Sequence, residues 1–268
     1  ANGTSVTFTN ISANDSKTVS VSLIKNKVKS KIKQYNRSQT LNVTRSKNAE
    51  SGSVAGGNGG SIADGLTFDA RYGLRVQDEE ISLNYPDVAK FLAVYESTNA
   101  SAPVLDKLTF TSTVAVQDNA IIGENIISQD SNIIARVVSS PSANTLEIVY
   151  LTSGKFQTGE LVHFEESDIN TNIESITIGK YKNVTNSFTL DKGQKDEFYD
   201  YSRLIRNRNV SEPSAQLLVV FDYYSVSSDD GDVFTVRSYD EERFSKDIPD
   251  IGEFNIRATD TLDFRPRV

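Results

Sequence analysis

Apolar and polar residues alternate along much of the chain. The segment from Thr18 to Lys25 reads TVSVSLIK, in which Val19, Val21 and Leu23 alternate with serines. Side chains two residues apart point to the same face of a strand, so this pattern predicts a half-buried β-strand. Similar runs separated by turn residues recur throughout the sequence. We therefore expect an all-β protein with little helix, built of two or three sequential β-sandwich or small-barrel domains.

The segment from Lys25 to Lys33 supports two interpretations. As a helix it would place Ile24, Val28 and Ile32 on one stripe, four residues apart. As a strand it would place Lys29, Lys31 and Lys33 on one face. The preceding strand favours a hairpin, with the lysines on a solvated face or guarding a sheet edge at the periphery.

Two Gly-Glu pairs stand 36 residues apart, in IGENIIS at 122–128 and TGELVHF at 158–164. Each pair precedes an apolar strand, polar turn residues and a second strand. Glycine turns the chain easily, and Glu124 and Glu160 would then bond backbone N–H groups at the strand entry. We interpret the repeat as a compact unit of about five short strands, not as the pair of carboxylates of a glycosidase.

The last third predicts a helix near Gln194 to Asn207, because acidic residues come early and arginines late, although the tyrosines of this segment also permit an extended form. The apolar run at 217–224 predicts the best core strand of the chain. An Asp-Gly turn at 227–232 would connect it to a strand at 233–236, so 217–221 and 233–236 are expected to pair.

These elements divide the chain into three regions. Residues 1–109 form an N-terminal β-sandwich region that contains a Gly-rich loop at 51–65. Residues 110–180 form the small β domain with the duplicated Gly-Glu units, and residues 181–268 form a C-terminal β region that packs with the first. The Gly-rich loop lacks the Gly-Lys-Ser/Thr of a phosphate loop and is expected to be a linker.

Composition excludes several functional classes. The net charge of −8 has the wrong sign for wrapping nucleic acid or an anionic membrane. No apolar run approaches the ~20 residues of a membrane span. Cysteine is absent, and His163 is the single histidine, in a strand-like run. Thiol chemistry and histidine-rich metal sites are therefore excluded, and we expect no cofactor.

The carboxylate runs do not predict a catalytic or metal site. Carboxylates at Asp78, Glu79 and Glu80 would point to opposite faces of a strand, which favours a turn or a solvent-facing edge. The run of Asp229, Asp230 and Asp232 lacks the spacing and the distal glutamate of an EF-hand. We expect no enzyme here.

Tyrosines offer the alternative of a carbohydrate- or receptor-binding module. Sugars stack on aromatic rings, and four tyrosines are candidates for such a surface: Tyr199, Tyr201, Tyr223 and Tyr224. Core packing explains each of them more simply. Clustering of tyrosines on one exposed face would favour binding.

Several motifs occur in the same order as in a known group of proteins. GLRVQDEEISLNYPDVAKFLAVYES, the two GE units, LDKGQKDEFYDYSRLIR, LLVVFDYYSV, GDVFTVRSY and DTLDFRPRV resemble large virion structural proteins of marine T4-like cyanophages. The likeness covers residues 65–268. It implies a non-catalytic structural component of a tail fibre or baseplate, located in the virion.

The resemblance also implies partners. Proteins of that group are much longer, which favours a fragment of a longer polypeptide. We expect contacts with identical copies, as a homo-oligomeric trimer, and with other tail proteins, made through sheet edges, loops and termini. Host surface glycans are the partner under the alternative function.

Overall fold

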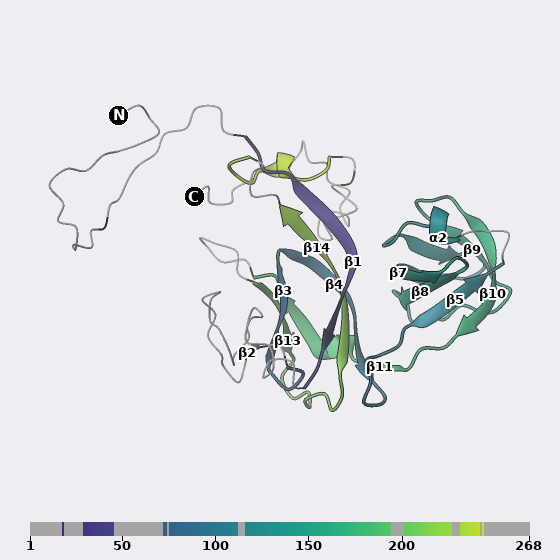
Figure 1. Cartoon of the computed structure of the whole chain (residues 1–268), viewed down its shortest axis with the longest axis horizontal. Helices are drawn as coiled ribbons and strands as arrows, with labels where there is room; N and C mark the ends of the chain where they lie inside the picture. The colour runs from purple at the N-terminus through teal and green to yellow at the C-terminus, as the bar shows by residue number, and fades with distance from the viewer. Residues whose placement is uncertain are drawn as a thin grey trace.

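A computed structural model describes residues 29–45, 75–111, 116–193, 201–226 and 231–241, together with residues 18, 72–73 and 243. Within these ranges the protein consists of two sheets and a closed barrel (Figure 1). The α-helix described there is the short α2 (Val116–Asn119). The expectation of an all-β protein with little helix is therefore confirmed.

The first sheet has four antiparallel strands in the order β1-β14-β4-β11. Its strands are β1 (Lys33–Val43), β14 (Leu217–Val226), β4 (Val88–Ser97) and β11 (Tyr181–Asn183). Strands from both ends of the described sequence thus meet in one sheet.

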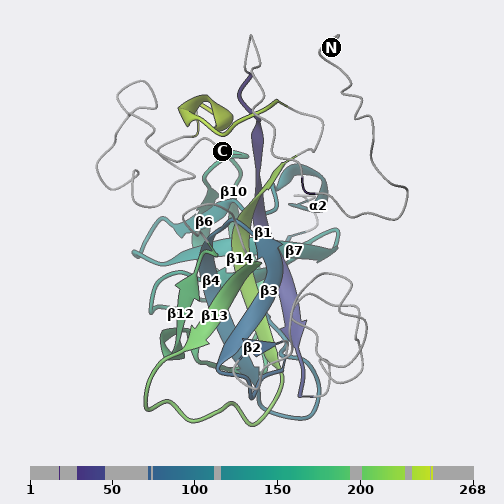
Figure 2. The same ribbon diagram turned by 90° about the vertical axis from the view of Figure 1, so that its left-hand side faces the viewer.

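The second sheet has the order β12-β13-β3-β2. It contains β12 (Phe188–Asp191), β13 (Tyr201–Arg206), β3 (Glu80–Pro86) and β2 (Tyr72–Gly73). Turning the molecule brings this sheet to the front, with the barrel behind (Figure 2). The two sheets share one apolar cluster, to which Ile81 and Leu204 contribute from the second sheet and Val94 and Val219 from the first. They therefore form a sandwich.

The barrel lies between β4 and β11 in sequence and closes in the order β10-β5-β8-β7-β6-β9. Its strands are β5 (Asp106–Phe110), β6 (Asn125–Ser128), β7 (Ile134–Ser142), β8 (Thr145–Tyr150), β9 (Leu161–Phe164) and β10 (Asn170–Thr177). Closure leaves no unpaired edge among these strands. The sequence predicts about five short strands around the Gly-Glu pairs at 110–180, whereas the barrel has six and begins with β5 at Asp106.

Strand β14 is buried on both faces, which explains its continuous apolar run. Leu217, Val219 and Phe221 point into the sandwich core. Leu218 and Val220 point the other way, into a cluster that includes Val138 and Val149 of the barrel. Alternate residues of one strand therefore hold the sandwich together and attach the barrel to it.

Two predicted elements of the last third are wrong. Strand β14 pairs with β1 and β4, and Val233 instead forms an isolated parallel bridge with Ser30. A strand buried on both faces gains more from long partners than from a short neighbour in sequence. In the described part of the helix predicted near Gln194–Asn207, residues 201–206 form β13 instead, which is the extended alternative, and Ser202 and Leu204 are buried there. Residues 194–200 lie outside the described residues. Pairing with β3 and β12 outweighs the dipole pattern of the charges.

The lysine row does not form a uniformly solvated face. Lys29 is exposed and Lys31 half-buried, but Lys33 is 3 % exposed. The Lys33 ammonium forms an ion pair with Asp87 and lies near the rings of Tyr224, Phe234 and Tyr239. Residues 19–28, the Gly-rich loop 51–65 and the carboxylates of Asp229 and Asp230 lie outside the described residues.

Candidate functional site

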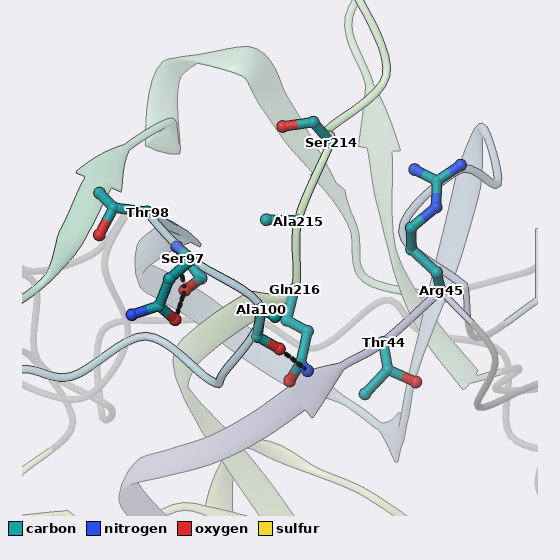
Figure 3. A pocket seen from close by; sticks show the side chains of 9 residues that line it. Thr44, Arg45, Ser97, Thr98, Ala100, Ser214, Ala215 and Gln216 are labelled. Atoms are coloured by element: carbon teal, nitrogen blue, oxygen red, sulfur yellow. Dashed lines mark hydrogen bonds between the residues drawn. The ribbon is translucent and has the colours of Figure 1, made fainter.

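A polar pocket of about 540 Å³ lies where β1, β4 and β14 meet the loop before β14 (Figure 3). Its wall is mostly uncharged, with hydroxyl and amide groups from Ser97, Asn99 and Gln216. These groups already bond within the protein: Gln216 donates to the carbonyl of Ala100 (2.8 Å), and Ser97 Oγ lies 3.2 Å from Asn99 Oδ1. The pocket is therefore formed by loops that stabilise each other, and it presents no nucleophile paired with a base.

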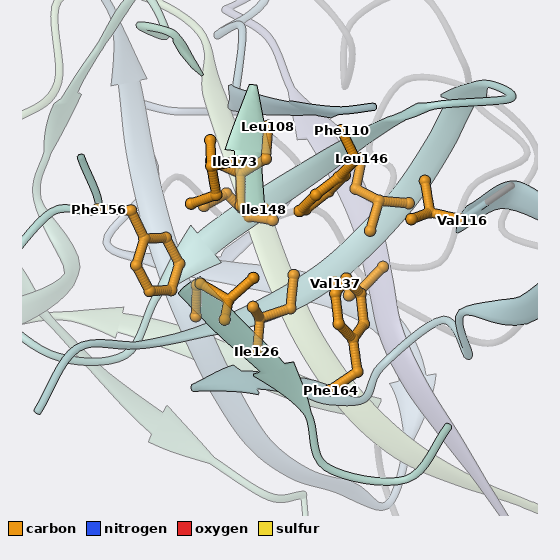
Figure 4. Close-up of a cluster of buried hydrophobic side chains, with 12 residues drawn as sticks. Leu108, Phe110, Val116, Ile126, Val137, Leu146, Ile148, Phe156, Phe164 and Ile173 are labelled. Atoms are coloured by element: carbon orange, nitrogen blue, oxygen red, sulfur yellow. The ribbon is translucent and has the colours of Figure 1, made fainter. Parts of the chain in front are cut away.

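The barrel interior is a packed core (Figure 4). Its buried side chains are apolar and come from every strand, among them Phe110, Ile126, Leu146 and Phe164. The rings of Phe110 and Phe164 lie 5.6 Å apart between centroids. Like other small barrels, this one is filled by its own side chains. A ligand would have to bind outside it.

The two Gly-Glu units are one structure used twice, with a constant offset of 36 residues. The N–H of Gly123 donates to Val137 and that of Val137 to Glu124; the N–H of Gly159 donates to Ile173 and that of Ile173 to Glu160. The strand pairs β6–β7 and β9–β10 also have equivalent registers.

Two equivalent hydrogen bonds also connect the units to each other. The N–H of Gln129 donates to the carbonyl of Leu161, and the N–H of Glu165 donates to the carbonyl of Asn125. The barrel therefore contains a repeat of 17 residues, 121–137 and 157–173, related by an approximate two-fold axis between the antiparallel β6 and β9.

Glu124 and Glu160 hold the turns of this repeat, as the sequence predicts. Glu124 is fully buried, and its carboxylate accepts the N–H of Ile121 (2.6 Å) in its own turn. It also accepts the N–H groups of Glu166 (3.0 Å) and Ser167 (2.9 Å) in the turn of the other unit. Buried backbone N–H groups need hydrogen-bond partners, and this carboxylate supplies them in both turns. Such a group stabilises the turns.

Glu160 makes equivalent contacts, in part through the hydroxyl of Ser128. Its carboxylate accepts the N–H of Gln157 (2.7 Å) and the hydroxyl of Ser131 (3.0 Å). Ser128, at the position of Phe164 in the other unit, donates to Glu160 and accepts the N–H of Ser131 (3.0 Å). Burial raises the pKa of Glu160, but these hydrogen bonds outweigh burial and lower it.

Asp222 joins the sandwich to the barrel. Its buried carboxylate accepts the N–H of Ser38 (2.7 Å) and the hydroxyl of Tyr35 (2.8 Å), and Arg136 of the barrel lies 3.9 Å away. Ser38 has a φ of 53° at a bulge in β1, and its hydroxyl donates to Val137 of the barrel (2.9 Å). This carboxylate therefore fixes the junction between the two parts.

A second buried carboxylate, Asp106, anchors the other side of the junction. It accepts the hydroxyl of Tyr181 and the N–H of Gly179 (2.9 Å), and Lys155 lies 3.4 Å away. Tyr181 stacks on Tyr95 at 3.9 Å between ring centroids. Burial, together with the Asp106 charge, raises the pKa of Tyr95 to about 12, and burial together with the hydrogen bond to Asp106 raises the pKa of Tyr181.

The other candidate residues of the sequence analysis also make contacts within the fold. Asp78 is buried and accepts the N–H of Arg75 (2.9 Å) in a turn, as predicted, although it does not face solvent. His163 is a half-exposed residue of β9, as predicted, 3.9 Å from Asp168. Asp232 accepts the N–H of Lys29 (3.0 Å). Over the described ranges, no three His, Cys, Asp or Glu residues gather as metal ligands.

The four candidate tyrosines do not lie together on one face. Tyr223 packs against Tyr85 (4.3 Å between centroids) in the sandwich, Tyr201 is half-buried in β13, and Tyr199 lies outside the described residues. Tyr224 instead lines a groove with Tyr35 and Tyr239, neither of which the sequence singled out. Tyr35 and its hydrogen-bond partner Asp222 are 187 residues apart in the sequence, so no local sequence pattern predicts their contact.

Comparisons with known protein families, with curated proteins and with solved structures find no match for this chain. In the described part of the chain, no helix has the length and apolar character needed to cross a membrane.

Proposed function

We propose that this chain is a non-catalytic structural module of a bacteriophage tail appendage, either a tail fibre or the baseplate. The observation that supports the proposal most directly is that the buried carboxylates of the chain stabilise its fold. Glu124 caps two turns, while Asp222 and Asp106 join the barrel to the sandwich. A hydrolase would need such groups to face a cleft together. Here they hold the fold together.

The assignment to a phage tail rests on the resemblance of the ordered motifs to virion structural proteins. The absence of cysteine is consistent with a particle part that persists without redox chemistry. The barrel, the sandwich and the two anchored junction contacts suit a rigid building block. Such a module works by keeping its shape and by contacting its neighbours in the particle.

The expected neighbours are identical copies, in a trimer, and other tail proteins. Among the described strands, β1 and β11 are the outer strands of the first sheet. An outer strand carries N–H and C=O groups that a neighbouring chain can complete. Contacts through such strands require no large apolar patch, which fits a mean hydropathy of −0.38.

The test is cross-linking of the native particle followed by identification of cross-linked peptides from this chain. The proposal predicts cross-links from β1 or its neighbouring loops to a second copy or to another tail protein. Light scattering after gel filtration of the isolated chain measures the oligomer directly. A chain that is absent from purified particles and remains monomeric would refute the structural role.

A second candidate function, binding at the host surface, is favoured by one observation. Three tyrosines and three arginines line a single groove between β1 and residues 236–243. This combination brings the apolar ring faces of tyrosine and the anion-binding donors of arginine to one lining.

A further inference from the structure

The groove has a volume of about 650 Å³, within the ~300–1,000 Å³ range of small-molecule sites. One wall is β1, whose alternate residues Lys33, Tyr35 and Arg37 line it. The other wall is formed by Arg237, Tyr239 and Arg243. We call this cavity the basic groove.

The second wall is fixed to the strand by hydrogen bonds. The N–H of Lys31 donates to Val233 (2.8 Å), and the hydroxyls of Ser30 and Thr235 lie 2.6 Å apart. Thr235 and Ser238 form a capping box around the 3₁₀ turn η2 (Val236–Ser238). The two walls are therefore held together by the sequence segments that flank β1 and η2.

The charges in the groove are unevenly matched. Arg37 and Arg243 share one carboxylate, that of Glu166. Burial raises the pKa of Glu166, but the hydrogen bonds and charges of these two arginines outweigh burial and lower it. The third guanidinium, Arg237, is exposed and has no carboxylate within ion-pair distance among the described residues.

Asp240 is the carboxylate on the groove lining. Among the described residues of the groove, three guanidiniums face two carboxylates, Glu166 and Asp240, which leaves an excess of one positive charge in this part of the chain. Lys33 adds nothing to this excess because Asp87 neutralises it. On a chain with a net charge of −8, this is a local site for an anion.

Arginine geometry adds to the charge. Arg37 uses its Nη1 for Gly123 and Glu166, and its Nη2 donates to no acceptor in the described part of the chain. A guanidinium binds a carboxylate or sulfate through parallel N–H donors. Arg37 and Arg237 therefore supply donors that the fold itself leaves available.

The aromatic rings contribute the second half of the recognition. Tyr35 and Tyr239 are half-buried, and both contact Tyr224 between them, with ring centroids 5.0 Å and 5.2 Å from its ring. Their hydroxyl ends are polar and their faces apolar, a combination suited to ligands with one wet and one apolar side. A sugar ring has such sides.

From these observations we infer that the basic groove binds an acidic saccharide, with the anionic group on Arg37 and Arg237 and the ring against Tyr35 and Tyr239. A carboxylate and a sulfate offer the same oxygen geometry to these donors. This inference deepens the second candidate function, host-surface binding. It does not depend on where the chain sits in a particle.

Nucleic acid is the less favoured ligand of a groove with arginines and aromatics. Binding along a strand requires many phosphate contacts and a basic track. Here a single excess positive charge stands on an acidic protein, so one anionic group per ligand is the better match.

The experiment is calorimetric titration of the whole chain at low salt with four probes. They are an oligogalacturonate, a sulfated dextran fragment, neutral dextran of equal length and a single-stranded oligonucleotide. We expect binding to one or both acidic saccharides, none to neutral dextran, and weaker binding to the oligonucleotide. The galacturonate and sulfate arms identify which anion is preferred.

Two variants locate the site. Arg237→Gln should weaken binding about tenfold, the value of one lost charge-assisted hydrogen bond. The matched control is Arg208→Gln, an equally exposed arginine that does not line the groove, which should leave binding unchanged. Thermal melting checks that both variants fold. Tyr239→Ala should weaken binding independently of salt, because the ring contact carries no charge.

Three results would overturn the inference. They are failure of both acidic saccharides to bind, equal weakening by Arg237→Gln and Arg208→Gln, and tighter binding of the oligonucleotide. None of them bears on the particle cross-links, so the inference and the structural role can fail separately.

Discussion

Gly123 of the barrel lies directly against Arg37 of β1, so closely that a β-carbon on the glycine would overlap the Cβ of Arg37. The same backbone also has a φ of +86°, which L side chains rarely adopt. Gly159, at the equivalent position of the repeat, has a φ of +87° but no atom within 4 Å of its added β-carbon. One copy of the turn thus became a junction, while the other stayed on the surface.

This difference makes the two glycines a matched pair. Gly159→Ala should lower the free energy of unfolding by about 1–2 kcal/mol, the cost of a left-handed backbone for an L residue. Gly123→Ala should cost a further ~1–3 kcal/mol, because Arg37 must move. Urea unfolding of both variants measures the difference. Equal losses would show that the barrel and β1 do not touch at Gly123.

The repeat also predicts unequal costs for its glutamates. Glu124→Gln should lower the free energy of unfolding by roughly 3 kcal/mol, because an amide N–H₂ would meet backbone N–H donors in a buried site. Glu160→Gln should cost less, since Glu160 is half-exposed and bonds partly through Ser128. Glu174→Gln, at an exposed residue of β10, is the control. A large loss for Glu160 alone would contradict the role assigned to Ser128.

The contacts of Asp222 predict that its substitution destabilises the junction between the sandwich and the barrel. Asp222→Asn removes the negative charge that Ser38 and Tyr35 donate to, and with it a carboxylate that lies near Lys90 and Arg136. The loss should be about 3–5 kcal/mol, as for other broken buried ion pairs. Limited proteolysis should cut the variant faster at the junction. Asp118→Asn, on the exposed side of α2, should change neither measurement.

The raised pKa values of the buried tyrosines predict how the stability of the protein changes at alkaline pH. Burial, followed by the Asp106 charge, raises the pKa of Tyr150 to about 12, as it does for Tyr95, and that of Tyr181 is also raised. A raised pKa in the folded state contributes stability below the unfolded value of about 10, and this stability disappears as the pH rises toward 12.

The chain lacks tryptophan, so tyrosinate absorbance reports the ionisation of its eleven tyrosines without interference from indole, and the buried ones appear as those that ionise last. At about pH 11, the native protein should show fewer tyrosinates than the urea-unfolded protein. The melting temperature should fall across the same pH interval. Equal native and unfolded titration curves would contradict the buried positions of these phenols.

Sequence alone determined the class of fold and the meaning of the Gly-Glu pairs. Apolar runs and period-two alternation are local properties of each strand, and together with the Gly-Glu pairs they identified the strands around Asn125–Ser128, Leu161–Phe164 and Leu217–Val226. Glycine at a positive φ followed by a turn-capping carboxylate is also local, which is why Glu124 and Glu160 were interpreted correctly.

Tertiary structure decided which strands pair and which side chains meet. β14 takes β1 and β4 as neighbours because both of its faces are buried, a fact that no window of the sequence contains. The charge pattern near Tyr201 predicted a helix because the long-range partners of β13 were unknown. The basic groove joins residues about 200 positions apart, such as Lys33 and Tyr239. Contacts over such separations depend on the packing of the whole chain, so only the folded structure reveals them.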